Sequence, residues 1–319
     1  MKRHDAPPPA SADDDPLGRQ YRPAQKGVCT KMADEHTTPQ ASGQEPALPN
    51  PLDDVKHVIA VGAGKGGVGK STVAALLAAG LMRRGRKAAL LDADVYGPSL
   101  PMLTGTIGAQ PYVGEDGMIV PPRKDGLSIM SMGYLVPDDQ AVIWRGPMAQ
   151  KYVSEFLARC VWGRIDCLIV DLPPGTGDIP LTLAQTIPLT GAVVVCTPQD
   201  VALVDAIKAL RMYEKLGVKP LGIVENMSYH VCPQCGHREE TFGHGGAEQA
   251  ARRLNVPFLG GIPLNIAIRR NGDAGALFDN FTDTEGYVAE AIEAVVEALV
   301  ERLDEQAKAS QPLPQLKIE

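Results

Sequence analysis

The stretch "GKGGVGKS", Gly64 to Ser71, has the spacing G-x-x-x-x-G-K-[ST] of a phosphate-binding loop. Its glycines let backbone N–H groups turn toward phosphate oxygens, and the helix that follows adds the positive end of its dipole. We expect Lys70 to reach the β- and γ-phosphates of ATP and the Ser71 hydroxyl to bind Mg²⁺. The predicted nucleotide-binding residues of this loop are Gly64, Lys65, Gly66, Gly67, Val68, Gly69, Lys70, Ser71 and Thr72.

Acidic residues follow two apolar runs further along the chain. "LLDADVYGPS" contains Asp92 and Asp94, and "LIVDLPPGTGD" contains Asp171. A carboxylate at the carboxyl end of a strand beside a phosphate loop can hold Mg²⁺ through water or orient the attacking water. We assign Asp171 to the metal, through water, and Asp94 to the attacking water; the alternative for Asp94 is a solvated turn. The predicted catalytic residues are Lys65, Lys70, Asp94 and Asp171.

Lys65 is a second lysine in a loop that needs only one. It places a further cation near the phosphates, either in its own chain or across to a second chain, and spacing does not decide between the two. A solvated surface lysine is the remaining alternative.

The sequence "CPQCG" brings Cys232 and Cys235 two residues apart, as in a metal-binding knuckle. A tetrahedral Zn²⁺ or a [4Fe-4S] cluster needs four ligands, and one knuckle supplies two. The missing pair is either His230 and His237 of the same chain or an identical knuckle from a second chain, because a twofold axis brings like residues together. The histidines are not assigned as ligands.

Short apolar runs alternate with helical patterns from residue 56 onward, which is typical of an α/β fold. We predict a doubly wound, mostly parallel sheet with helices on both faces. The predicted strands are 57–61, 87–92, 167–172, 192–197, 221–226 and 258–263. The predicted helices are 70–84, 147–160, 179–186, 201–216, 247–254 and 286–306, and 114–135 is expected to be a small hairpin insertion.

The chain divides into three parts by composition. Residues 1–53 are rich in proline and poor in large apolar groups, so a disordered tail is expected. Residues 54–308 form the predicted ATPase domain, with the knuckle inserted at about 228–243. Residues 309–319 are expected to be a flexible C-terminus.

Composition excludes several classes of protein. A net charge of −7 gives no support to nucleic-acid binding. No apolar run reaches the length of a membrane span, and no apolar stretch follows the basic start, so we expect a cytoplasmic protein without membrane contact. Six scattered cysteines do not make a disulfide framework. Cys167 and Cys196 lie in apolar runs and are expected to be buried, and Cys29 stands alone in the tail.

The loop with its additional lysine resembles the deviant Walker-A motif of the MinD, ParA and nitrogenase iron protein class. That resemblance implies that Lys65 reaches across a nucleotide-sandwich dimer to the partner's phosphates. It also implies that Asn226, which closes the run "LGIVEN", contacts the adenine base. An amide that both donates and accepts suits that edge.

A finer resemblance is to the Mrp/ApbC/Nbp family of iron–sulfur cluster carrier ATPases. It covers about residues 55–300, in the blocks "LLDADVYGPSLPML", "WRGPM", "DLPPGTGD", "TPQDVAL" and "VENMSYHVCPQCGHREETFGHGGA". It implies a homodimer that binds and hydrolyses ATP, holds a bridging [4Fe-4S] cluster on Cys232 and Cys235, and transfers it to apo iron–sulfur proteins. The extension differs from the Nbp type, because Cys29 is its only cysteine.

Two other functions stay open at this point. One is a MinD- or ParA-like positioning ATPase with a structural zinc knuckle, although the acidic final helix does not suit a membrane or DNA surface. The other is an electron donor like the nitrogenase iron protein, whose cysteines do not form a C-x-x-C pair.

Overall fold

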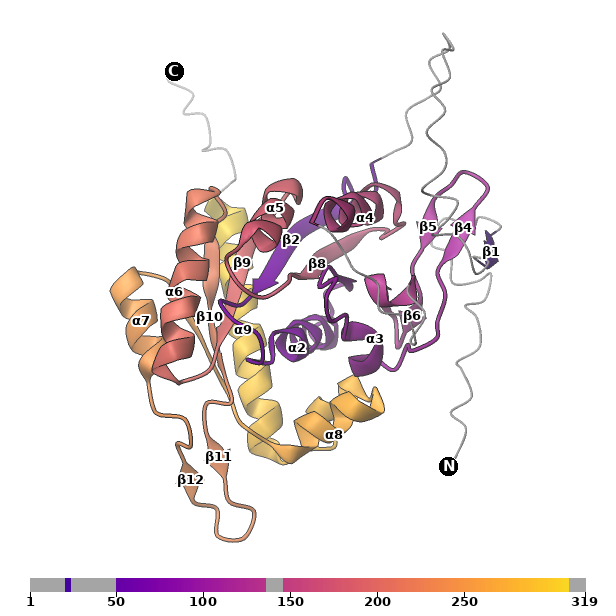
Figure 1. Ribbon diagram of the computed structural model, residues 1–319. Helices are drawn as coiled ribbons and strands as arrows, with labels where there is room; N and C mark the ends of the chain where they lie inside the picture. The colour runs from indigo at the N-terminus through magenta and orange to yellow at the C-terminus, as the bar shows by residue number, and fades with distance from the viewer. Residues whose placement is uncertain (1–20, 24–49, 136–145, 310–319) are drawn as a thin grey trace, which may run out of the picture.

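The computed structural model describes residues 21–23, 50–135 and 146–309. Their centre is an eight-stranded sheet whose inner neighbours are all parallel, with one antiparallel pair, β6 and β7, at an edge (Figure 1). Across the sheet the strands are β13 (Phe258–Ile262), β10 (Pro220–Asn226), β9 (Gly191–Cys196), β2 (Val55–Gly62), β8 (Ile165–Asp171), β3 (Ala88–Asp92), β7 (Leu127–Ser131) and β6 (Arg123–Lys124). The prediction of a doubly wound, mostly parallel sheet is confirmed.

Helices cover both faces of this sheet (Figure 1). One face carries α2 (Lys70–Arg83), α3 (Leu100–Leu103), α8 (Ile266–Ala274), the 3-10 helix η3 (Leu277–Phe281) and α9 (Gly286–Ala309). The other carries α4 (Gly146–Arg159), α5 (Asp178–Thr186), α6 (Asp200–Lys215) and α7 (Gly246–Leu254). Each predicted strand and helix therefore has a counterpart, with ends that differ by a few residues.

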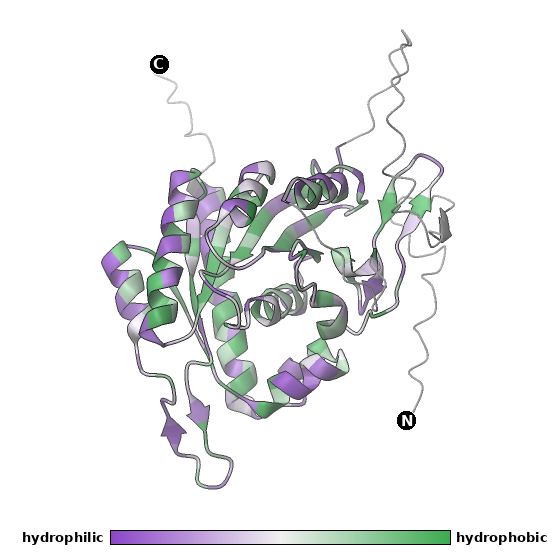
Figure 2. Ribbon diagram, viewed as in Figure 1, coloured by the Kyte–Doolittle hydropathy of each residue, from purple (hydrophilic) through white to green (hydrophobic). Residues whose placement is uncertain are grey.

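The strands are buried on both sides, which explains their nearly continuous apolar sequences. Figure 2 shows hydrophobic strands between helices whose outer surfaces are more hydrophilic. Two separate clusters of buried side chains fill the two faces. Close helix packing needs a small residue at Gly80 of α2, where an added Cβ would meet Val296 of α9 at 2.4 Å. Cys167 and Cys196 are buried, as predicted.

The region predicted as a hairpin insertion at 114–135 is different in part. β4 (Tyr112–Gly114) and β5 (Ile119–Val120) do pair antiparallel. Leu127–Ser131, however, is β7, which pairs in parallel with β3 and belongs to the main sheet. The prediction was wrong for this strand because its partner lies far away in the sequence, where local turn signals carry no information.

Most of the predicted tail lies outside the described residues, and so do Cys29 and residues 310–319. Tyr21–Pro23 form β1, which pairs antiparallel with β4. Within the described ranges, no helix combines the length and the apolar character needed to cross a membrane.

Candidate functional site: a phosphate loop and a cysteine hairpin

The glycine-rich loop joins β2 to α2, as the motif requires. Gly67 and Gly69 have φ angles of 82° and 79°, in the left-handed region that favours glycine. Gly64 lies against the backbone of α6, where an added Cβ would be 2.1 Å from the Asp205 carbonyl. The conformation of the loop therefore depends on glycine at these three positions.

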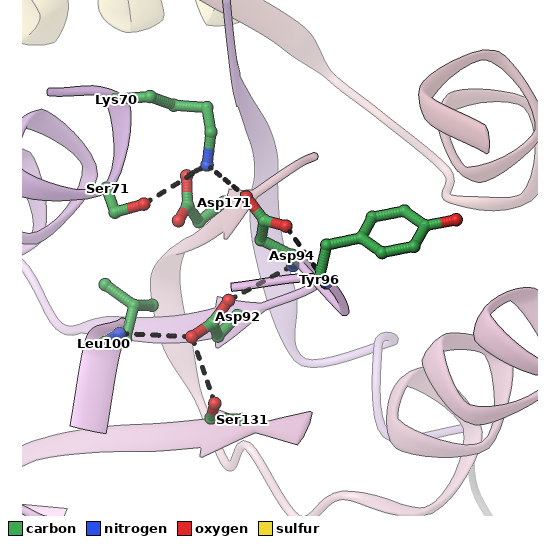
Figure 3. Close-up of polar contacts among 8 residues, drawn as sticks. All are labelled: Lys70, Ser71, Asp92, Asp94, Tyr96, Leu100, Ser131 and Asp171. Atoms are coloured by element: carbon green, nitrogen blue, oxygen red, sulfur yellow. Dashed lines mark hydrogen bonds and ion pairs between the residues drawn. The ribbon is translucent and has the colours of Figure 1, made fainter. Parts of the chain in front are cut away.

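Lys70 joins the loop to two acidic strand ends (Figure 3). Its Nζ lies 2.5 Å from Asp171 Oδ1, 3.4 Å from Asp94 Oδ2 and 3.2 Å from Ser71 Oγ. The residues that the sequence assigned to phosphate, metal and water thus meet around one ammonium group.

Asp171 ends β8 and is completely buried. Burial raises the pKa of this carboxyl, while the charge of Lys70 and hydrogen bonds from Lys70 and Ser71 act in the opposite direction. Its Oδ2 has no hydrogen-bond partner among the described residues. A buried carboxylate oxygen without a partner is costly, and it is the kind of atom that a magnesium-bound water would satisfy.

Asp92 ends the neighbouring strand, β3, and is also completely buried. It accepts hydrogen bonds from the backbone N–H groups of Asp94 (3.1 Å) and Leu100 (3.1 Å) and from Ser131 Oγ (3.0 Å). These bonds use both oxygens, so Asp92 fixes the loop from 93 to 100. The sequence placed Asp92 and Asp94 together as candidates for metal or water, and the structure leaves that position to Asp94.

The side chains of Asp94 and Lys65 make fewer polar contacts than that of Asp92. Asp94 Oδ1 accepts only a long hydrogen bond, 3.3 Å, from the Tyr96 N–H. Lys65 is partly exposed and has no hydrogen bond or ion pair with any other residue in the described part of the chain. Lys65 is therefore available to a ligand or to a second chain, whereas Asp94 is buried and paired with Lys70. The assigned roles of both residues stay predictions.

Asn226 ends β10 and lies against the phosphate loop from the side. Its Nδ2 donates to the Val68 carbonyl at 2.9 Å, and an added Cβ on Gly69 would be 2.2 Å from the same nitrogen. The structure thus places Asn226 beside the nucleotide site, and contact with a base stays a prediction.

The two neighbouring cysteines lie on a separate feature. β11 (His230–Val231) and β12 (Arg238–Glu239) form a short antiparallel hairpin that projects from the body of the molecule (Figure 1). The Gly236 N–H donates to the Cys232 carbonyl and the Cys232 N–H to the His237 carbonyl, each at 2.9 Å, so the knuckle is a closed turn. Backbone hydrogen bonds from Cys235 and Gln234 lower the pKa of the Cys232 thiol.

In the part of the chain that the structure describes, no third metal ligand lies beside the two cysteines. Among the residues that the structure describes, no group of three or more His, Cys, Asp or Glu side chains is placed to hold a metal ion. His230 Nδ1 lies 3.3 Å from the Leu264 carbonyl, and His244 Nδ1 pairs with Glu240 at 2.8 Å. The hairpin alone therefore offers two thiolates, and the alternative with histidines from the same chain is not supported by this geometry.

Two residues that hold the site together were missed from the sequence, and so was one buried acidic residue next to it. Ser131 and the Leu100 N–H hold Asp92, and they come from β7 and α3, which the sequence did not reveal as neighbours. Glu225, only 3% exposed, lies beside Asn226. Its signal was visible in the sequence, because it is an acidic residue inside the otherwise apolar run "LGIVEN".

Known proteins resemble this chain over most of its length. Residues 54–300 match the family model described as ParA, NUBPL iron-transfer P-loop NTPase. An iron-sulfur cluster carrier protein of Haemophilus influenzae is 52% identical over 69% of this chain and 60% of its own length. That of Deinococcus radiodurans is 48% identical over 80% of this chain and 71% of its own. The chain spans about 60% of the length of the first of these relatives.

Solved structures agree with the fold. A nucleotide-binding protein from Archaeoglobus fulgidus, in complex with ADP, superposes with a TM-score of 0.65 at 40% identity, over 72% of this chain and 90% of its own. The cell division ATPase MinD of Pyrococcus furiosus superposes with a TM-score of 0.53 at 22% identity, over 77% of this chain and 98% of its own. The second likeness concerns the fold alone.

Proposed function

Because the chain belongs to the family of NUBPL-type iron-transfer P-loop NTPases, we propose that it is an ATP-dependent carrier of a labile [4Fe-4S] cluster. The observation that carries this proposal is a hairpin with two thiols, built onto a phosphate-loop domain, to which the described residues of the chain add no third ligand. The carrier binds and slowly hydrolyses ATP, holds the cluster between two copies of the chain and passes it to apo iron–sulfur proteins.

The nucleotide site has the groups that Mg·ATP requires. Loop N–H groups and Lys70 would bind the β- and γ-phosphates, and the Ser71 hydroxyl and Asp171 would hold the metal, Asp171 through water. Bound Mg²⁺ neutralises charge that develops on the phosphates. In the structure the Lys70 ammonium forms ion pairs with Asp171 and Asp94, so it has to turn toward the phosphates when ATP binds. That turn frees Asp94 for the attacking water.

Hydrolysis then requires that the attacking water is positioned and that the negative charge on the phosphates is stabilised. A water held by the Asp94 carboxylate attacks the γ-phosphorus, forming a new P–O bond as the bond to the β-phosphate oxygen breaks. The proton of that water passes to the phosphate product, and ADP leaves with the electron pair of the broken bond. Lys65 of a second chain adds a further cation at the phosphates. Lys65 makes no hydrogen bond or ion pair with another residue in the described part of its own chain, which supports this arrangement.

The cluster is cargo, and its binding needs two chains. Four thiolates complete the coordination of a [4Fe-4S] cluster, and a twofold axis through the hairpin tips brings Cys232 and Cys235 of each chain to it. Exposure of Cys235 supports transfer, because a recipient's thiols can reach the cluster from outside. Such chemistry suits a reducing compartment, so we place the carrier in the cytoplasm.

Anaerobic reconstitution with iron and sulfide tests the proposal. Wild type is expected to bind about four irons per dimer and to show the absorbance of a [4Fe-4S] cluster. The double variant Cys232→Ser, Cys235→Ser is expected to bind essentially no iron and to keep its affinity for Mg·ATP. The matched control is Cys167→Ser, which removes a buried thiol far from the hairpin. Stoichiometric zinc without iron in reconstituted wild type would refute the carrier and leave a positioning ATPase with a zinc knuckle.

A further inference from the structure

Glu225 and Asn226 are consecutive residues at the carboxyl end of β10, and their side chains point to opposite faces of the sheet. Asn226 points to the face of α2 and the phosphate loop. Glu225 points to the face of α6 and α7. Two adjacent positions on one strand therefore contact two different parts of the molecule.

Asn226 is in direct contact with the phosphate loop. Its amide bonds to the Val68 carbonyl at 2.9 Å, and it leaves no space for a side chain at Gly69. The same loop is the part that phosphates would contact. A shift of its backbone that would lengthen this hydrogen bond beyond about 3.2 Å therefore has to move the amide or break the bond.

Glu225 holds the base of the cysteine hairpin. Its Oε1 accepts from Ser228 Oγ at 2.7 Å, and its Oε2 accepts from the Ala247 N–H at 3.1 Å. Ser228 is where the chain enters the segment that carries the two cysteines, and Ala247 is where it has just left that segment to begin α7. A single buried carboxylate thus fixes both ends of the hairpin segment, residues 229–246.

We propose that Glu225 is a positioning residue that couples the phosphate loop to the cysteine hairpin through its neighbour Asn226. This inference rests on the proposed function in that the loop binds nucleotide. When nucleotide moves Val68 and Gly69, Asn226 moves with them, and the Glu225 carboxylate shifts the two ends of the hairpin segment together. The nucleotide state then sets the orientation and accessibility of Cys232 and Cys235.

Thiol alkylation measures this coupling without a cluster. The full apo chain is treated with iodoacetamide under anaerobic conditions, with and without Mg·ATP, and the peptide that contains both cysteines is quantified by mass spectrometry. In wild type, Mg·ATP is expected to change the alkylation rate by about fivefold, the lower end of typical coupling between sites. Analytical ultracentrifugation in each state separates this change from protection by dimer formation.

Three variants decide whether Glu225 transmits the effect. Glu225→Met removes both acceptors at similar volume, so the response to Mg·ATP is expected to vanish while affinity for the nucleotide persists. Glu225→Gln is expected to restore the response, because its oxygen can accept from the Ala247 N–H and its amide can donate to Ser228 Oγ. The control Glu248→Gln removes an exposed ion pair with Arg252 in α7 and is expected to respond as wild type does.

Ser228→Ala keeps the inference falsifiable if Glu225→Met fails to fold. It removes one of the two bonds and is expected to reduce the response. A wild-type chain that binds Mg·ATP with no change in alkylation, or a folded Glu225→Met or Ser228→Ala chain with a full response, would overturn the coupling. Reconstitution with zinc instead of iron would refute the carrier and leave the alkylation result standing, so the two failures are distinguishable.

Discussion

Asp92 and Asp171 are register partners at the carboxyl ends of two adjacent parallel strands, and both carboxyls are completely buried. Burial and the neighbouring Asp171 raise the pKa of Asp92 to about 8. Lys70 bonds directly to only one of this pair, Asp171. Each buried carboxyl therefore disfavours ionisation of the other, and a cation bound beside the pair would lower the pKa of both.

This pair makes stability depend on pH in an unusual direction. A raised pKa means that the folded chain keeps protons that the unfolded chain releases above its own value of 3.8, so stability is lost as the pH rises toward about 8. Asp171→Asn removes one such carboxyl and the like charge beside Asp92. We expect the free energy of unfolding of the variant, relative to that of wild type, to increase by about 1 kcal/mol or more between pH 5 and pH 8. Urea unfolding at each pH measures it. A decrease of the variant's free energy of unfolding relative to wild type over this pH range would contradict the assigned pKa shifts.

Lys70→Ala is expected to weaken binding of a fluorescent ATP analogue by about 100-fold or more, or about 3 kcal/mol, because it removes the cation that faces the β- and γ-phosphates. Equilibrium titration measures the effect. Lys208→Ala, which removes an exposed lysine paired with Asp205, is the control and should bind normally. Equal affinities would mean that the loop does not bind phosphate.

Lys65→Ala should leave nucleotide affinity nearly intact and reduce ATP turnover by about 100-fold, since its charge is proposed to act on the transition state. Mixing it with Asp94→Ala, also inactive, tests where the lysine acts. If Lys65 acts across the dimer, the mixed dimer contains one complete site and activity returns. Two inactive variants that stay inactive together, although they form mixed dimers, would place Lys65 in its own chain's site.

Gly69→Ala and Gly67→Ala form a matched pair, because both glycines have left-handed φ angles and only Gly69 is crowded. An added Cβ costs about 1 kcal/mol of stability at either position through the backbone alone. At Gly69 it also displaces the Asn226 amide from the Val68 carbonyl, adding about 1 kcal/mol. Thermal or urea unfolding of the apo chain measures the difference. In an Asn226→Ala background the two substitutions should cost the same, and a persisting gap would have another cause.

Cys232 should react with iodoacetamide at lower pH than the same cysteine in the urea-unfolded chain, because backbone hydrogen bonds from the knuckle lower the pKa of its thiol. A pH series of alkylation rates, with the modified residue located by peptide fragmentation, gives the comparison. Gly236→Pro removes the N–H that closes the turn on the Cys232 carbonyl, and it should move the reactivity toward the unfolded reference. Identical profiles for folded and unfolded wild type would contradict the closed knuckle.

The sheet was predictable because its inner strands are continuous apolar runs, such as "CLIV" before Asp171, and such runs need no knowledge of their partners. β7 was not predictable, since "LSIMS" is short and contains two serines, and it belongs to the main sheet only because it pairs with β3. α8 was missed because its nine residues include two arginines, an asparagine and an aspartate with little apolar periodicity.

The site divides in the same way. Lys70, Ser71, Asp94 and Asp171 were found because a motif fixes each of them to a loop or a strand end, and the fold brings those ends together. Ser131 contributes a hydrogen bond to Asp92, which lies 39 residues away in sequence. No sequence motif predicts contact between residues so far apart. Glu225 did carry a local signal, but one of its two partners, the Ala247 N–H, follows only after the cysteine hairpin, 22 residues along the chain.

Because one carboxylate holds both ends of residues 229–246, the chain leaves the phosphate-loop domain and returns to it at nearly the same point. Such an excursion can be lengthened, shortened or exchanged during evolution without rerouting any strand of the sheet. Lineages can therefore alter what this segment binds while inheriting the same phosphate-loop domain. For protein engineering, the same geometry makes the segment a natural place to graft a foreign metal-binding peptide onto that domain.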